Sequence, residues 1–263
     1  MNKPQFNANQ FDLPVQAGWQ IAVARRLNDD WDLEARYFNL GGQSATLPTI
    51  SSNVGAGVLF APTSQGLFFP PLNTNLSYTS QLQNVEINAC RSLNDCVGVL
   101  ADVRYLQLDD RILVSELTTG KGFDATQRLD GFSDMVGFQI GGDAVLLRRG
   151  RLSLDTSLKA GIYDDMARNA FTYDSTALAV HSASGASASN VAFCGEVGIT
   201  ATYDLTQRLS LRGGYQLLRL DGVALASQQS IVNPPPLLGA ATTVATRGDV
   251  FYNGAFIGLE YRR

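Results

Sequence analysis

The sequence predicts an all-β fold: an antiparallel up-and-down transmembrane β-barrel of about ten strands, within a range of eight to twelve. Apolar and polar residues alternate with a period of two in segment after segment, and helical periodicity is almost absent. Short turns alternate with long segments rich in Gly, Ser, Thr, Asn and Pro, as the short periplasmic turns and long external loops of outer-membrane barrels do. Because 263 residues suit one large barrel, we expect residues 1–263 to form a single domain.

Four hairpins and a final strand carry the alternation. The hairpins pair residues 19–24 with 31–37, 85–89 with 97–105, 136–143 with 152–160, and 191–203 with 209–217, and the last strand covers residues 251–261. The segments 41–76, 117–130, 164–189 and 226–248 are predicted as long loops. Nine strands cannot close an antiparallel barrel, so either residues 2–16 supply a tenth strand or further strands lie upstream of Met1.

The two faces of these strands differ in the way that a membrane barrel requires. The apolar face is predicted to point outward to lipid, with an interfacial girdle of aromatic residues near the strand ends: Trp19, Trp31, Tyr37, Tyr105, Tyr203, Tyr215 and Tyr261. The polar face carries few ions, of both signs, and is predicted to form a salt-bridged network in the lumen. The predicted lumen residues are Asp32, Glu34, Arg36, Glu86, Asp102, Arg104, Asp143, Asp155, Lys159, Glu196, Arg212 and Glu260.

Composition and charge disfavour other classes of protein. The net charge of −4 and a charged fraction of 17% disfavour nucleic-acid binding. No stretch approaches the roughly 18 uninterrupted apolar residues of a membrane-spanning helix. One histidine and three cysteines are too few for the usual His- or Cys-rich metal sites, so we expect neither a metal nor a cofactor. No apolar core follows Lys3, so no signal peptide is visible: the chain is a mature form, or its start is missing.

Several phrases of the chain resemble planctomycete-type outer-membrane β-barrel proteins, akin to the major-outer-membrane-protein group. They include residues 17–19, 31–38 and 252–261, and the likeness runs from about residue 17 to the end without one diagnostic motif. The resemblance implies an integral protein of a Gram-negative outer membrane, with no catalytic residues to carry over. Family members usually begin with an export signal and end on an aromatic residue, whereas this chain ends Tyr261-Arg262-Arg263.

Cysteine and histidine offer little chemistry. Cys90 and Cys96 flank a five-residue turn, and an oxidising periplasm would allow them to form a disulfide that clamps the hairpin, whereas reduced thiols are the alternative. Cys194, on the face of Glu196, is expected to be a free thiol. His181 lies beside Ser182 in a predicted loop without a nucleophile-elbow motif, so an enzyme is not expected.

The leading functional hypothesis is an outer-membrane barrel that acts as a narrow porin-like channel or as a structural component of the cell envelope. Its expected partners are outer-membrane lipid and the barrel-insertion machinery, with no nucleic acid, and homo-oligomerisation stays open. The alternative is a soluble β-barrel that binds a small apolar ligand in its interior. That protein would turn its aliphatic side chains inward and its charges to solvent, the reverse of the membrane barrel.

Overall fold

Nine strands form one continuous antiparallel sheet in the computed structural model, which describes residues 15, 17–52, 72–118, 124–176, 179–232 and 243–262. In the sheet, each strand pairs with the next along the chain, in the order β1 to β9. The elements are β1 (Gly18–Arg26), β2 (Trp31–Ser52), β3 (Leu72–Ser92), β4 (Val97–Thr118), β5 (Asp124–Arg149), β6 (Leu152–Ser175), β7 (Val180–Asp204), β8 (Leu209–Val223), α1 (Ala226–Val232) and β9 (Gly248–Tyr261). The expected all-β, antiparallel, up-and-down architecture is therefore confirmed.

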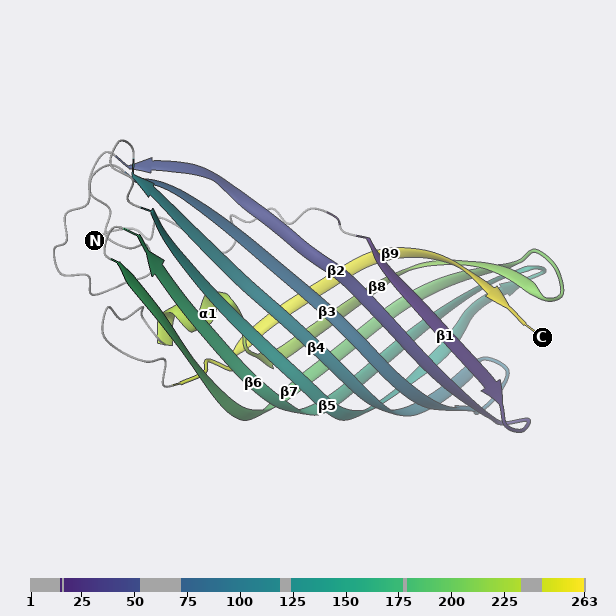
Figure 1. Cartoon of the computed structure of the whole chain (residues 1–263). Coiled ribbons are helices and arrows are strands. Elements are labelled where there is room, and N and C mark those ends of the chain that lie inside the picture. The colour runs from purple at the N-terminus through teal and green to yellow at the C-terminus, as the bar shows by residue number, and fades with distance from the viewer. Residues whose placement is uncertain are drawn as a thin grey trace, which may run out of the picture.

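The strands are steeply tilted and the sheet curls into a half-barrel (Figure 1). Its two edges are β1 and β9, and the described residues contain no pairing between them. Because nine strands alternate in direction, both edge strands run the same way. The predicted tenth strand falls on residues 2–16, which lie outside the described residues except for Val15.

Four short turns gather at one end of the sheet, together with the C-terminus, and the strands that lead into the longer connections reach the other end (Figure 1). Asn28 builds the first turn, since its side-chain oxygen accepts the amides of Asp30 (3.0 Å) and Trp31 (2.9 Å). The side-chain oxygens of Asn94 and Thr206 likewise accept the amides two and three residues further on, in the β3–β4 and β7–β8 turns. Gly150 turns the β5–β6 hairpin with a φ of +60°, which glycine adopts without strain.

The long predicted loops are wrong in extent, because the strands continue far into them. The strands β6 and β7 pair from Leu152↔Tyr203 to Ser175↔Val180, so most of residues 164–189 is hairpin. The strands β4 and β5 likewise pair as far as Leu117↔Asp124, within residues 117–130. Alternation persists there with its polarity reversed: Ala167 is buried while its neighbour Arg168 is exposed. Charged and small residues on the outer face gave these segments the composition of loops.

The sheet divides into two halves of opposite polarity. We call residues 18–37, 84–105, 136–163, 191–217 and 251–262 the short-turn half, and the remaining described residues the long-connection half. Every large exposed hydrophobic residue that the structure describes lies in the short-turn half, except Val15 and Met166. Most buried aliphatic side chains lie in the long-connection half, including Leu76, Leu82, Leu106, Leu108, Ile112, Val114, Leu129, Leu218 and Leu220.

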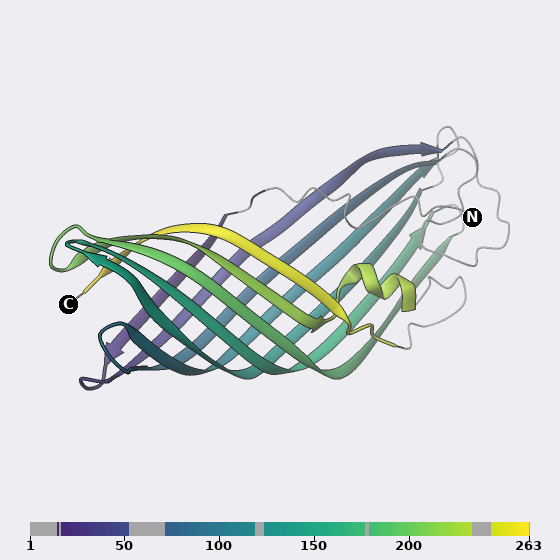
Figure 2. The same cartoon turned by 180° about the vertical axis from the view of Figure 1, so that it is seen from behind.

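The interior of the long-connection half is filled by two apolar clusters. One joins β2, β3, β4 and β5 to β8 and β9 through residues that include Phe38, Leu82, Leu106, Met135 and Leu220. The other lies nearer the long connections and packs Ala226 of α1 against Ile112 and Phe171. The helix therefore lies within the curl of the sheet (Figure 2). None of the described helices has the length and hydrophobicity to span a membrane.

Candidate functional site: an ionic cluster inside the short-turn half

Strand register creates two facing rows of alternating charge. Across β2, β3 and β4, Arg36 pairs with Glu86 and Glu86 pairs with Arg104. Across β6 and β7, Lys159 pairs with Glu196. Opposite charges that lie directly across neighbouring strands attract one another. Each row is therefore held together within its own wall of the sheet.

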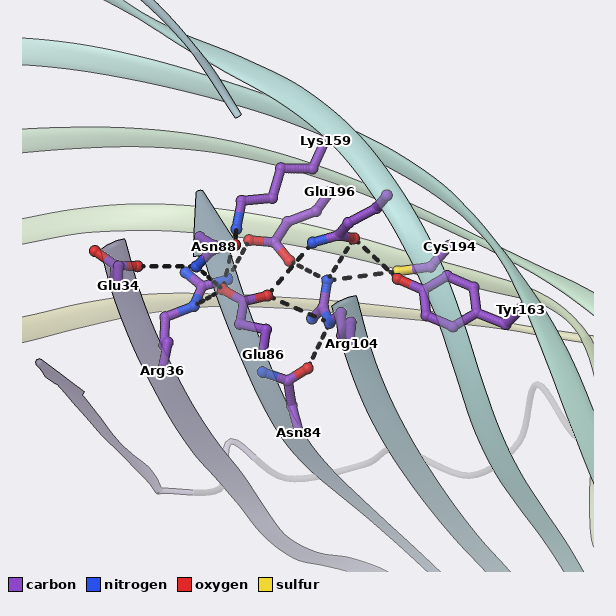
Figure 3. Close-up of polar contacts among 11 residues, drawn as sticks. Glu34, Arg36, Asn84, Glu86, Asn88, Arg104, Lys159, Tyr163, Cys194 and Glu196 are labelled. Carbon is purple, nitrogen blue, oxygen red and sulfur yellow. Dashed lines mark hydrogen bonds and ion pairs between the residues drawn. The ribbon is translucent and has the colours of Figure 1, made fainter. Parts of the chain in front are cut away.

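The curl of the sheet brings the two rows together (Figure 3). Glu196 receives Arg104 Nη1 on Oε2 and Arg36 Nη2 on Oε1, each at 2.9 Å. Lys159 Nζ reaches Glu86 Oε1 at 3.0 Å from the opposite wall. Glu86 also contacts Arg36, and its Oε2 lies 3.5 Å from Arg104 Nε. These ion pairs join β2, β3 and β4 to β6 and β7 across the interior.

The cluster is deeply buried. The side chains of Arg104 and Glu86 are 0% exposed, and that of Glu196 is 4% exposed. Removing such ions from water is expensive unless they are paired and hydrogen-bonded on most of their polar atoms. The density of ion pairs here meets that requirement for the two glutamates.

Uncharged polar side chains complete the cluster. Asn88 Nδ2 donates to Glu34 (3.1 Å) and to Glu86 (3.2 Å). Gln139 Oε1 accepts from Arg104 Nη1 (3.2 Å) and from the Tyr163 hydroxyl (2.9 Å). The predicted network missed Asn84, Asn88, Gln139 and Tyr163 because it considered only Asp, Glu, Lys and Arg. Their signal was present, since residues 84, 86 and 88 alternate onto one face.

Some buried polar atoms in the cluster lack a partner with hydrogen-bond geometry. They are both carboxyl oxygens of Asp102, Nη2 of Arg104, Nδ2 of Asn84 and Nε of Arg36. Asp102 interacts electrostatically with Lys159 and Arg104. The three cations thus face three buried carboxyl groups, those of Glu86, Glu196 and Asp102, and the half-buried Glu34 lies beside them. The paired side chains reach across the interior and can narrow a lumen there. The described residues hold no group of three or more potential metal ligands.

The structure brings seven of the twelve predicted lumen residues into or beside this cluster: Glu34, Arg36, Glu86, Asp102, Arg104, Lys159 and Glu196. The other five lie elsewhere. Arg212 pairs with Glu260 at 3.4 Å, with both side chains partly exposed, and Asp32 lies 3.5 Å from the exposed Arg26. Asp143 and Asp155 lie near one another on β5 and β6, without a cation from the cluster.

The predicted disulfide between Cys90 and Cys96 is wrong, since both cysteines are free thiols. Cys90 lies directly opposite Leu100 in the β3–β4 ladder, whereas Cys96 lies within the turn. A disulfide needs the two Cβ atoms close together, and this register does not oppose them. Cys194 is a free, buried thiol, as expected. His181 is exposed and contacts the exposed Asp174, an outer surface pair of β6 and β7.

Comparison with known proteins adds no assignment: no protein-family model matches the chain, and no curated protein matches it. The resemblance found in the sequence therefore stays a prediction.

Proposed function

We propose that the protein is an integral outer-membrane β-barrel of a Gram-negative envelope, with a lumen that the ionic cluster narrows. It acts as a narrow porin-like channel or as a structural component of the envelope. The observation that carries the proposal is the polarity of the short-turn half. Its exterior is aliphatic and aromatic, and its interior holds buried ions, which is the polarity of a membrane barrel.

The exterior of the short-turn half is too apolar to face water favourably. Phe138, Ile140 and Ile162 on neighbouring strands are 74%, 72% and 66% exposed. Full burial of such a side chain stabilises by about 1.5–3 kcal/mol, and contiguous apolar patches beyond a few hundred Å² are rare on soluble monomers. Lipid tails would cover this band. Outer-membrane lipid is therefore the first proposed partner.

Aromatic and polar groups meet at the border of the apolar band. The rings of Trp19 and Tyr37 contact one another in a tilted arrangement, with centroids 4.9 Å apart. The Tyr105 hydroxyl donates to Asp134 Oδ1 at 2.9 Å, so its ring lies on the apolar side and its polar tip on the charged side. Amphipathic rings at such a border are typical of a membrane interface. This girdle supports a membrane boundary between the two halves.

Closure requires an odd number of further strands between β1 and β9. The two edges run in the same direction, so one added strand can lie antiparallel to both. A strand that precedes β1 and is joined to it by a turn at the long-connection end would run antiparallel to β1. We propose that the chain before β1 provides this strand. Copies inserted in the same orientation could pair their edges only in parallel, so a homo-oligomer would not substitute for it.

Insertion would depend on the barrel-insertion machinery. Tyr261, at the end of β9, is 66% exposed and points outward with Ile257 and Leu259. An exposed aromatic residue at the end of the last strand is the feature that the resemblance associates with this partner. No cofactor, metal or nucleic acid enters the proposal, and no catalytic role is proposed for any residue.

A soluble ligand-binding barrel is the less supported alternative. It would bury Leu33, Val103, Leu158 and Leu211 and expose Asp102 and Lys159. Instead the four aliphatic residues are 38–62% exposed, while Asp102 and Lys159 are 5% and 6% exposed. The long-connection half does have an apolar interior, but α1 packs into it.

Membrane fractionation tests the proposal. We expect the expressed protein to sediment with membranes, to require detergent for extraction and to insert into lipid vesicles. Recovery as a monodisperse monomer without detergent would overturn the membrane assignment. Planar-bilayer recordings then separate the two roles, since step currents support the channel and their absence supports the structural component.

A further inference from the structure

The connection from β8 to β9 turns into the sheet instead of leaving it. Ala224 and Ala226 are 0% exposed, and Gln229, one helical turn further on, is 3% exposed. Ala226 packs with Leu76, Ile112, Val114, Leu129 and Phe171, contributed by four different strands. Residues 224–229 therefore occupy the interior of the long-connection half. We call them the plug.

Specific contacts to β5 anchor the start of the plug. The backbone amide of Ala224 donates to Ser133 Oγ at 2.9 Å, and Ser133 Oγ donates to Asp165 Oδ2 at 3.1 Å. Gly131 allows this approach, because a Cβ there would lie 2.4 Å from the Ala224 carbonyl oxygen. A side chain at residue 131 would push the plug away. The strand is thus built to receive it.

A second set of contacts holds the end of the plug. Asn169 Nδ2 on β6 donates to Gln229 Oε1 at 3.1 Å and to the Thr243 carbonyl at 2.9 Å. Gln229 Nε2 donates to the Ala245 carbonyl at 2.8 Å. Gln229 therefore joins the outgoing and returning parts of the β8–β9 connection to each other and to β6.

Two buried carboxyl groups lie beside these anchors. Asp110 on β4 is 1% exposed and Asp165 on β6 is 0% exposed. Neither oxygen of Asp110, and only Oδ2 of Asp165, has a partner with full hydrogen-bond geometry. Burial raises the pKa of Asp110 to about 7 and that of Asp165 to about 6. Both lie in the half that we place outside the membrane.

The groups facing these carboxyls do not offset their burial. Asp110 meets the Tyr78 hydroxyl from β3 and the Ala226 backbone amide from the plug, with Tyr252 of β9 nearby. Asp165 meets Ser133 of β5 and Asn190 of β7, and the acids that act on it are Asp134 and Asp164. No cation is among the groups that act on either carboxyl in the described part of the chain.

We propose that the plug is a pH-dependent gate, which docks while Asp110 and Asp165 are protonated and undocks when they ionise. Water would then enter the long-connection half down to the ionic cluster. The gating role rests on the proposed membrane function, whereas the docking equilibrium does not.

The direction of the pH effect follows from proton binding. In the undocked state water solvates both carboxyls, whose pKa values return to the ordinary value of about 3.9. The docked state therefore binds more protons between pH about 4 and about 7. Docking is strongest below this window, weakens as the pH rises through it, and is weakest above it.

Hydrogen exchange of the full-length protein in detergent tests the docking equilibrium. We expect the protection factors of amides in residues 224–229, corrected for intrinsic exchange, to fall at least about tenfold from pH 5 to pH 8, because one pKa unit is a tenfold change in an equilibrium constant. Asp110→Asn with Asp165→Asn keeps both side chains neutral, so protection should persist at pH 8. Protection that does not change with pH in the unsubstituted protein would overturn the proposal.

The control uses the neighbouring acids on the same strands. Asp109 and Asp164 lie on the outer face, and burial acts on Asp165 more strongly than Asp164 does, so Asp109→Asn with Asp164→Asn should retain most of the pH dependence of the unsubstituted protein. Loss of pH dependence in this control would contradict the assignment to Asp110 and Asp165. Asn169→Ala removes the anchor of Gln229 without touching either acid, and should lower protection already at pH 5. This variant keeps the proposal testable if the double Asn variant fails to fold.

Bilayer recordings test the gate separately. We expect a higher open probability at pH 8 than at pH 5, with the difference lost in the Asp110→Asn, Asp165→Asn variant. pH-dependent protection without step currents would support the docking equilibrium and overturn the channel role. Currents that are insensitive to pH would overturn the gate while leaving the membrane assignment intact.

Discussion

The short-turn half and the long-connection half are built from the same strands but have opposite polarity. On β4, Val103 and Tyr105 point outward while Asp102 and Arg104 are buried. Further along the same strand, Arg111 is exposed while Ile112 and Val114 are buried. The period of two thus persists while the apolar face changes sides. Periodicity specifies a strand, and the side that is apolar indicates what surrounds it.

Strand length supports the same division. A tilted transmembrane strand needs about 9–11 residues. The strands β5 and β6 have 26 and 24 residues, more than twice that length. In the proposed membrane barrel, only part of each strand would lie in hydrocarbon, and the rest would project into water. The charged exterior of the long-connection half, with Arg111, Arg128, Asp134 and Arg168, suits that position.

The largest expected effect comes from breaking the ionic cluster. Glu196→Ala would leave Arg36 and Arg104 with one shared carboxylate, that of Glu86, instead of two in a buried site, which should destabilise the fold by about 3–5 kcal/mol. Glu260→Ala removes a carboxylate from a partly exposed pair with Arg212, and should change stability by only about 0–1 kcal/mol. Chemical denaturation in detergent micelles measures both. Equal losses would contradict a special role for the buried cluster.

The next largest expected effect comes from comparing the outer faces of the short-turn half and the long-connection half. Ile162 and Met166 are both outward on β6 and similarly exposed, at 66% and 62%. Ile162 lies between Phe138 and Phe193, whereas Met166 lies between Asp134 and Ser189. Ile162→Arg should destabilise the inserted barrel by about 2–4 kcal/mol, the penalty for a cation deep in the bilayer, and Met166→Arg by about 0–1 kcal/mol.

Refolding into lipid vesicles across a denaturant series measures this pair of variants. The membrane boundary is confirmed if only the Ile162 variant loses stability. Two equal penalties would place the boundary beyond Met166, and two negligible ones would remove the lipid band from this face. The comparison is sensitive because the two residues lie on the same face of a single strand, only two periods of the alternation apart.

The sequence predicted the short-turn half better than the long-connection half for a physical reason. In residues 97–105 and 152–160 one face is apolar and the other polar, and both strands were placed correctly. In residues 164–175 the pattern reverses, since Ala167 and Phe171 are buried and Asp164 and Arg168 are outward. A search that assumes one polarity for the whole barrel interprets such segments as loops.

The ion pairs show a second limit. Arg36 and Glu86 pair in neighbouring strands. The alternation in the sequence already placed both on the polar face, but it did not give the register between them. Glu196 lies 160 residues from Arg36, on a strand that does not pair with β2. Their contact depends on how tightly the sheet curls. Curvature is a property of the whole sheet, so the face of each residue was predictable but its partner across the interior was not.

The smallest expected effect concerns the two ends of the sheet, which are held by different means. The long-connection end relies on the buried plug, whereas the short-turn end relies on self-contained turns such as that of Asn94, whose side chain accepts the amides of Cys96 (2.8 Å) and Val97 (2.9 Å). Asn94→Ala should destabilise by about 1 kcal/mol through loss of these bonds. Asp95→Ala, in the same exposed turn, should change stability by less than about 0.5 kcal/mol. Denaturation in micelles distinguishes the two variants, and an Asn94 variant as stable as the Asp95 variant would mean that pairing between β3 and β4 alone sets the turn.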